Sequence, residues 1–143
     1  MPLKPIYTTL GFSPCKSQYW NSLFPNPFSA ACKAQSIAAG LADIEGFSHQ
    51  VVLRAFDRSE GFDLLVTPPT DDRPHGLFTT RSPRRPNPIA LTVVELLSRK
   101  DTLLHVRGVD MLDGTPILDI KPNLSNIPEG KLRRGWQAEA EAR

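Results

Sequence analysis

The number and spacing of prolines constrain this chain more than any other feature of its sequence. Fourteen prolines are spread over 143 residues, and nine glycines accompany them. Proline has no backbone N–H and clashes with the preceding helical turn, so it is poorly tolerated inside helices and central strands. The sequence therefore favours short strands joined by shaped turns. We expect a mainly β fold, a small β-barrel or curled sheet.

Several stretches have the composition of strands. Residues 102–109 alternate, with Leu104 and Val106 on one face and polar side chains on the other. Residues 89–97 fit a helix or a strand by period alone, and their β-branched centre favours a strand. Strands are expected at residues 4–10, 49–56, 62–66, 89–97, 102–109 and 113–120, the last of which begins in an Asp-Gly turn.

The two ends of the chain are less regular. Residues 12–35 mix aromatic residues and prolines without a period, and we expect an irregular loop or packed arm there. Residues 1–35 as a whole are expected to form a divergent N-terminal arm. Residues 125–143 are a polar tail with good helix formers near its end, which predicts a docked or frayed helix. Because there is no internal repeat, we expect residues 1–143 to form a single domain.

The charge pattern says more than the net charge of +2. Residues 57–72 contain five acids and one base, whereas residues 73–100 contain six bases and one acid. This change of sign predicts a basic sector on the folded surface. The two cysteines lack metal-ligand spacing, so no metal site is expected. With no signal-peptide pattern and no apolar run long enough for a bilayer, we expect a cytoplasmic protein without membrane contact.

The stretch "RSPRRPNP" (81–88) combines three arginines with three prolines. Proline fixes its own φ and pushes the preceding residue into an extended conformation, so this loop is predicted to be stiff. Stiffness lowers the entropy lost on binding, and guanidinium groups suit phosphates or carboxylates. From composition alone, a binding loop and a stiff loop with solvated arginines are about equally supported.

Other candidate chemistry is weaker. Asp110 and Asp113 flank a turn, and spacing alone favours ordinary turn capping over a cation site. A lone His49 is more often a structural hydrogen-bonding group than a catalyst. The glycine patterns of dinucleotide and nucleoside-triphosphate sites are missing, as is a nucleophile elbow.

Three ordered segments together carry a resemblance to a known family. "GLADIEGFSHQVVL" (40–53), "GLFTTRSPRRPNPIALTVVEL" (76–96) and "VDMLDGTPILDIKP" (109–122) resemble the TsaA-like family, also called YaeB-like or TrmO-like. The resemblance implies a single-sheet β-barrel in place of a Rossmann methyltransferase fold. It also implies S-adenosylmethionine as methyl donor, a homodimer, and a tRNA substrate methylated on threonylcarbamoyladenosine beside the anticodon.

The resemblance also implies which residues act. The donor-binding residues would be Phe56, Asp57, Arg81, Leu91, Asp110, Met111, Leu112 and Asp113. The substrate-binding residues would be Arg84, Arg85, Asn87 and Lys121, of which Arg85 and Lys121 are also the catalytic candidates and Arg85 is the first choice for gripping the substrate carboxylate.

The chain departs from the family pattern in three places. A proline-arginine-glutamine stretch near the N-terminus is missing, Ala90 stands for a glycine, and Asn123 stands for a tyrosine. The C-terminal domain that some members carry is also missing, so donor binding is better supported than tRNA methylation. Three alternatives remain open: a non-catalytic donor-binding module, an RNA-binding barrel without a donor site, and a methyltransferase with another substrate.

Overall fold

The computed structural model describes residues 16–17, 29–33, 38–112, 114–124 and 126–143. It divides into two compact units, each described here by itself. The sheet unit comprises the chain up to Asp57 together with Ile89–Asn123, and the loop unit comprises Arg58–Pro88 together with Leu124–Arg143. Two compact units of this size are compatible with one domain or with two, so the expected single domain stays a prediction.

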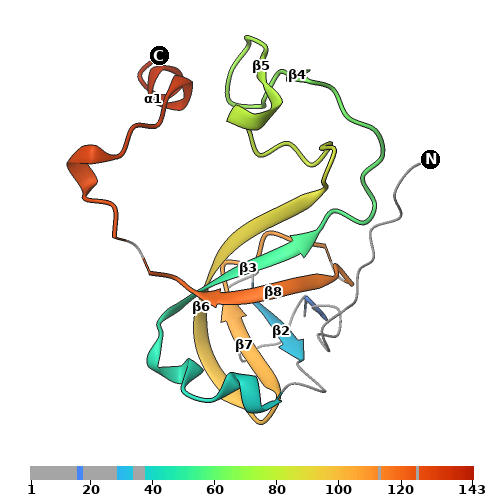
Figure 1. Ribbon diagram of the computed structural model, residues 1–143, viewed down its shortest axis with the longest axis vertical. Coiled ribbons are helices and arrows are strands. Elements are labelled where there is room, and N and C mark those ends of the chain that lie inside the picture. Colours follow the sequence, from blue (N-terminus) through green and yellow to red (C-terminus); the bar gives the residue numbers. More distant parts are fainter. Residues whose placement is uncertain (1–15, 18–28, 34–37, 113, 125) are drawn as a thin grey trace. The chain divides into compact units, whose positions relative to one another are not determined.

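The sheet unit contains one antiparallel six-stranded sheet with the order β1-β2-β7-β6-β3-β8 (Figure 1). Its strands are β1 (Lys16–Ser17), β2 (Ser29–Lys33), β3 (His49–Ala55), β6 (Ile89–Lys100), β7 (Leu103–Arg107) and β8 (Ile117–Pro122). This confirms the mainly β, non-Rossmann fold, and the sheet unit contains a single sheet. Among the described residues the ladder runs from β1 to β8 without a pairing that joins these two edge strands.

Strand β6 organises the sheet because it serves two partners along its length. Residues 89–95 pair with β3 and residues 95–100 pair with β7, and Figure 1 shows the long, curved strand. The register shifts between Leu96 and Ser98, and an extra residue of this kind bends a strand and increases its twist. Asp101, with φ 53°, starts the two-residue connection to β7, a position where Asp tolerates the left-handed region.

Alternation along β6 separates a core face from an outer face. Ala90 and Val94 are buried, whereas Leu91 and Val93 are each 43% exposed. The core cluster consists of Leu41, Val52, Val94, Leu104, Val106, Val109 and Ile117. Leu41 reaches this core from the first of two 3-10 helices, Ala38–Leu41 and Ile44–Gly46, which lie between β2 and β3.

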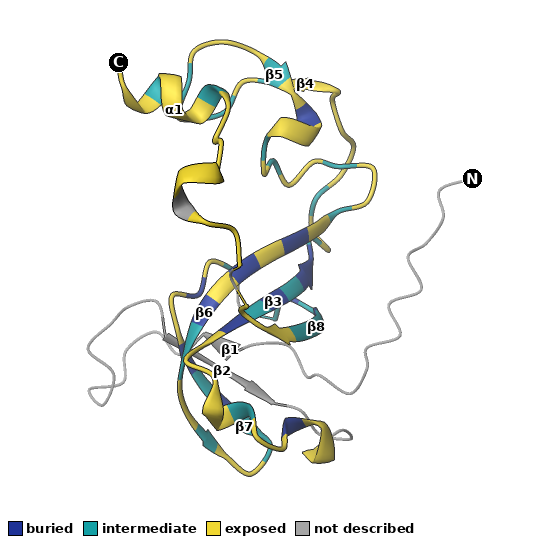
Figure 2. Cartoon of the chain, turned by 60° about the vertical axis from the view of Figure 1, so that its left-hand side comes forward, coloured by how far each residue is buried: buried dark blue, intermediate teal, exposed yellow. Residues whose placement is uncertain are grey.

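The loop unit has little regular structure. It contains the two-stranded pair β4 (Leu65–Val66) and β5 (His75–Gly76), the 3-10 helices η3 (Leu77–Thr79) and η4 (Glu129–Lys131), and helix α1 (Trp136–Glu141). Figure 2 shows that exposed residues dominate α1 and the β4–β5 region. The predicted helix near the C-terminus is confirmed as α1.

Two expectations about strands need correction. The predicted strand 62–66 is reduced to Leu65–Val66, where β4 pairs with β5. The irregular arm predicted for residues 12–35 is wrong at β1 and β2, because β7 supplies a partner for β2 across all five of its residues. The predicted strand 4–10 lies outside the described residues. No helix in the described part of the chain has the length and apolar character needed to cross a bilayer.

Candidate functional site

The residues predicted to act fall on both units. Phe56, Asp57, Leu91, Asp110, Met111, Leu112 and Lys121 belong to the sheet unit, and Arg81, Arg84, Arg85 and Asn87 belong to the loop unit. Asp113 lies outside the described residues. The assignments of these residues to donor or substrate stay predictions, and the geometry below states what surrounds each group.

In the sheet unit, the end of β3 lies against the turn that precedes β8. The Ala55 N–H donates to the Pro116 carbonyl at 3.0 Å, and Leu53 pairs with Leu91 on β6. The half-buried Phe56 and the exposed Asp57 follow directly. The end of β3, the start of β6 and the segment before β8 are therefore neighbours, as the predicted donor site requires.

The predicted Asp-Gly turn is confirmed by its hydrogen bonds. Thr115 donates to the Leu112 carbonyl twice, from its N–H at 3.2 Å and from Oγ1 at 2.6 Å. Gly114 has φ 78°, which a residue with a side chain rarely adopts. The turn leaves Asp110 exposed and Leu112 62% exposed, while Met111 packs against the core.

The other predicted residue of the sheet unit, Lys121, forms an ion pair with Asp119 on the same strand. Both side chains are substantially exposed, so this pair contributes little to stability. Asp119 also accepts the Ile120 N–H at 2.9 Å through Oδ1. The Lys121 ammonium remains accessible to a substrate anion.

Arg54 is the main residue of this region that the sequence reasoning missed. It is 7% exposed and donates from Nε to Thr92 Oγ1 at 3.3 Å, and its guanidinium lies 4.9 Å from the centre of the Phe56 ring. Burial lowers the pKa of Arg54, and the nearby Asp110 carboxylate opposes this effect. The alternation of the strand could have identified it, because Arg54 lies two and four residues after Val52 and Gln50 and shares the buried face of β3 with them.

In the loop unit, Arg85 is engaged with the backbone of its own loop. Its Nη1 donates to the carbonyl oxygens of Leu77, Thr80 and Ser82 at 3.3, 2.9 and 3.4 Å. The guanidinium also lies 5.6 Å from the centre of the Phe78 ring. Arg85 therefore shapes the turn between η3 and the proline-rich loop, in addition to any contact with a substrate.

The neighbouring polar residues of this loop have different surroundings. Arg81, Arg84 and Asn87 are exposed and make no hydrogen bond or ion pair with other described residues. Of the basic sector, Arg73, Arg85 and Arg99 are engaged with carboxylates or carbonyl oxygens. Arg81 and Arg84 are thus the arginines of this stretch whose guanidinium groups are available to an anion.

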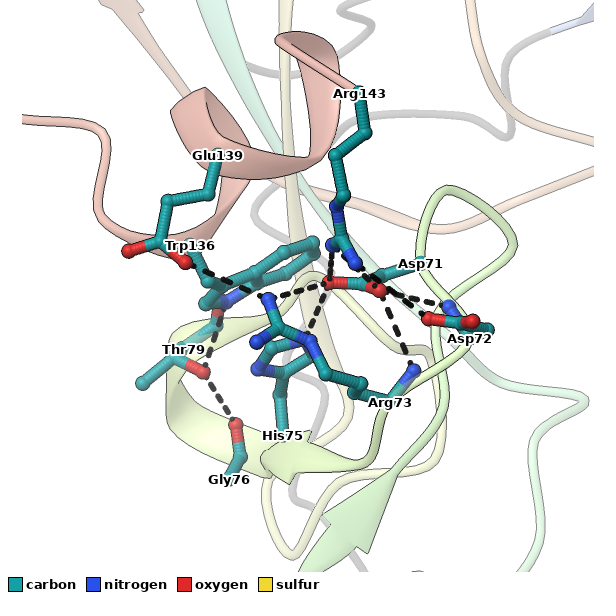
Figure 3. Close-up of polar contacts among 9 residues, drawn as sticks. All are labelled: Asp71, Asp72, Arg73, His75, Gly76, Thr79, Trp136, Glu139 and Arg143. Atoms are coloured by element: carbon teal, nitrogen blue, oxygen red, sulfur yellow. Dashed lines mark hydrogen bonds and ion pairs between the residues drawn. The ribbon is translucent and has the colours of Figure 1, made fainter.

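A second polar cluster of the loop unit is centred on Asp71, whose side chain is 1% exposed (Figure 3). Its carboxylate accepts from His75 Nε2 and from Arg143 Nη2, each at 3.0 Å, and from Arg73 Nη2 at 3.4 Å. Trp136 stacks on His75 with ring centres 4.1 Å apart and donates to the Thr79 carbonyl at 3.1 Å. These contacts attach α1 to the segment 71–79.

Burial by itself would raise the pKa of Asp71. The hydrogen bonds with His75, with the Asp72 side chain and with Arg73 outweigh burial and hold this pKa well below its ordinary value. In return, the hydrogen bond to Asp71 raises the pKa of Arg73. Asp71 is therefore an ionised structural carboxylate at neutral pH.

Comparison with known proteins identifies the family. Residues 27–128 match the model of the tRNA-methyltransferase O N-terminal domain. The chain belongs to this family. The TrmO-like resemblance drawn from the three sequence segments is thereby confirmed.

Named relatives of this family member are found in archaea and mammals. A "Probable S-adenosyl-L-methionine-binding protein" of Archaeoglobus fulgidus is 54% identical over 102 residues, which are 71% of this chain and 28% of that protein. An "S-adenosyl-L-methionine-binding protein" of the same organism is 42% identical over 85% of this chain and 88% of its own length. A mouse "tRNA (adenine(37)-N6)-methyltransferase" is 40% identical over 60% of this chain and 21% of its own.

Solved structures of TrmO share the fold. One superposes with a TM-score of 0.64 and 26% identity, covering 86% of this chain and 58% of that chain. TrmO from Pseudomonas aeruginosa gives a TM-score of 0.62 and 25% identity, covering 88% and 59%. This chain thus spans little more than half of the solved TrmO chains, and about a quarter of the first relative named above.

The residues of the sheet unit fit a sulfonium nucleoside. Such a ligand carries a positive charge, a flat aromatic base and an amino acid group. The accessible carboxylates of Asp57 and Asp110 suit the positive charge, and the half-buried Phe56 and the 43% exposed Leu91 offer apolar surface for a base.

Proposed function

We propose that this chain binds S-adenosylmethionine through its sheet unit and serves the N6-methylation of an adenosine beside the tRNA anticodon. The observation that carries the proposal is the family match over residues 27–128. It is supported by relatives named for S-adenosylmethionine binding and for tRNA adenine methylation. Threonylcarbamoyladenosine as the modified base and a homodimer as the active form are the finer parts of the proposal.

The residues of the donor site have separable tasks. Asp57 and Asp110 stabilise the cationic donor, and Phe56, Leu91 and Met111 contact its apolar parts. When bound, S-adenosylmethionine supplies an electrophilic methyl group on a sulfonium. The attraction to carboxylates has to be moderate, because catalysis requires stronger binding of the transition state than of the donor, and the positive charge is lost as methyl leaves.

The residues proposed to bind the methyl acceptor are those of the arginine loop (residues 81–88) and Lys121. The acceptor nitrogen of threonylcarbamoyladenosine lies between an adenine ring and a carbonyl group, so its lone pair is delocalised and its proton is comparatively acidic. Positioning and a nearby cation then lower the barrier without a strong base. Arg84 contacts a substrate anion, and Arg85 contributes both by holding the loop through Leu77, Thr80 and Ser82 and by its charge. Lys121, in the sheet unit, is a separate candidate for binding an anion of the substrate.

The first experiment is calorimetry of the purified chain with S-adenosylmethionine and with S-adenosylhomocysteine. Binding of both nucleosides supports the proposal, and the absence of heat with folded protein overturns it. The second is methyl transfer to tRNA, read by mass spectrometry of the nucleosides. Arg84→Ala is expected to weaken tRNA binding with little change in donor binding, and light scattering checks the homodimer.

A second candidate is a donor-binding module without catalysis of its own. The archaeal relatives are named for binding alone, and this chain covers only part of the longer proteins. Donor binding without methyl transfer to any tRNA from a deletion strain would favour this candidate.

A further inference from the structure

Arg54 is the buried charged residue of the sheet unit, at 7% exposed, and Asp71 is its counterpart in the loop unit, with a side chain 1% exposed. Buried charges in proteins are generally paired with an opposite charge, because removing an ion from water costs several kcal/mol or more. The Asp71 carboxylate follows that rule, because it binds Arg73, His75 and Arg143. Arg54 forms no ion pair with a described carboxylate, although the field of Asp110 reaches it.

Most of the hydrogen-bonding capacity of Arg54 is unused by the described residues. A guanidinium has five N–H donors, and here one donor, Nε, meets a described acceptor, Thr92 Oγ1 at 3.3 Å. The guanidinium carbon lies over the Phe56 ring, 4.9 Å from its centre, and this contact uses no N–H donor of a conventional hydrogen bond. The N–H groups on the two terminal nitrogens are therefore free for a planar acceptor, and arginine binds carboxylates in bidentate fashion through such groups.

The surroundings of Arg54 match an amino acid zwitterion. A carboxylate requires a cation, and the ammonium on the same carbon requires an anion close by. Arg54 and Asp110 are an electrostatically coupled pair of opposite sign that is not closed into an ion pair of its own. Arg54 lies next to the end of β3, where Phe56 and Asp57 are proposed to meet the donor, and Asp110 acts electrostatically on Arg54.

We propose that Arg54 binds the carboxylate of the methionine group of the donor nucleoside, with Asp110 facing the ammonium group. This inference rests on the proposed donor binding and adds to it a specificity-determining residue, which distinguishes donors that carry an amino acid from those that lack it. Thr92 acts through Arg54, because its hydroxyl fixes the orientation of the guanidinium.

The test is a calorimetric comparison of three ligands: S-adenosylmethionine, its decarboxylated form, and 5′-methylthioadenosine, which lacks the amino acid group. The wild-type protein is expected to bind S-adenosylmethionine about 10- to 100-fold more tightly than the decarboxylated form, the range of a charge-assisted contact. Arg54→Met is expected to abolish this preference and to leave the affinity for 5′-methylthioadenosine within about twofold. Arg54→Lys should retain part of the preference, and Arg107→Met, a paired arginine on the same sheet, should retain all of it.

Several results would overturn the inference. Equal weakening of all three ligands by Arg54→Met would show a structural role only, as would a wild-type protein that binds the three ligands equally well. If Arg54→Met does not fold, the wild-type preference and its reduction in Arg54→Lys still decide the question. Failure of the wild-type protein to bind any of the three would overturn the proposed function itself, which separates the two conclusions.

Discussion

Every buried apolar side chain of the described residues except Leu77 belongs to the sheet unit, whereas the loop unit exposes apolar side chains such as Phe78 at 73% and Leu124 at 72%. Figure 2 shows the same contrast, with buried positions alternating along β3 and β6. In the loop unit, the carboxylate of Asp71 and the stacked rings of His75 and Trp136 hold the C-terminal segment against residues 71–79 instead. One chain thus uses apolar burial in one region and a polar cluster in the other.

Because of this difference, the two units should respond differently to changes of pH. Apolar burial involves no titrating group, whereas a carboxylate that binds two arginines and a histidine depends on its own ionisation. The arginine loop and α1 contact the same segment, η3. The carbonyl of Leu77 accepts a hydrogen bond from Arg85, and the carbonyl of Thr79 accepts one from Trp136. The substrate side of the proposed function therefore rests on the more sensitive region.

The largest effect is expected from a cavity in the sheet unit. Leu104 is 1% exposed within the core cluster, so Leu104→Ala should lower the free energy of unfolding by about 2–5 kcal/mol. Urea denaturation measures this loss. Leu124→Ala in the loop unit, at a 72% exposed position, is the control and should change stability by less than about 0.5 kcal/mol. Comparable losses in the two variants would break the distinction between the units.

The next effect is the release of α1 by Trp136→Ala. This variant loses the stack on His75 and the hydrogen bonds to Thr79, at 3.1 Å to its carbonyl and 3.2 Å to its hydroxyl. Hydrogen exchange of residues 136–141 should accelerate roughly tenfold or more, while β3 and β6 exchange as before. Trp136→Phe keeps a ring for stacking and should lie between wild type and Trp136→Ala. Equal acceleration in the core strands would show that the two regions unfold together.

Acid should loosen the loop unit through Asp71. Its pKa is depressed in the folded state, so its stabilising contribution is complete above the unfolded pKa of about 3.9 and is lost as pH falls through the folded value. Fluorescence of Trp136, in a Trp20→Phe background, should therefore change only below about pH 4.

The controls for the acid experiment are two neighbouring carboxylates of unequal burial. Asp71→Asn should show the altered signal already at neutral pH and a weaker change in acid. Asp72→Asn should behave as wild type, because the Asp72 side chain is 89% exposed and that of Asp71 is 1% exposed. Identical acid profiles for the two variants would contradict a special role for Asp71.

The smallest effect is expected for an ion pair on the surface of the sheet unit. Arg107 and Glu95 face each other across β7 and β6, with side chains 44% and 36% exposed. Glu95→Gln should lower the free energy of unfolding by less than about 1 kcal/mol, and less still in high salt. A larger loss would show that the sheet unit also depends on charge.

Local pattern was sufficient for much of the fold. Alternation predicted β7, β-branched residues predicted β6, and turn chemistry predicted the Asp-Gly turn at residues 112–115. Three ordered segments were sufficient for the family. Strand β2 was missed because its "SAACK" sequence has weak strand propensity, and it forms only because β7 offers a partner edge.

Long-range pairing of charged groups was beyond the reach of the sequence. Asp71 binds Arg143 across 72 positions, and Arg54 binds Thr92 across 38. Arg85 was predicted to face an anion, and only its contacts with Leu77, Thr80 and Ser82 revealed that it also holds the loop.

By itself, the sequence determined the strand-rich fold and the family, because alternation, proline placement and short motifs are local properties. Only the tertiary structure decided which of the charged groups are already paired and which, like Arg54 and Arg84, remain available to a ligand. The physical reason is that pairing depends on distance and burial in space, and these are created when strands and turns far apart in the chain come together.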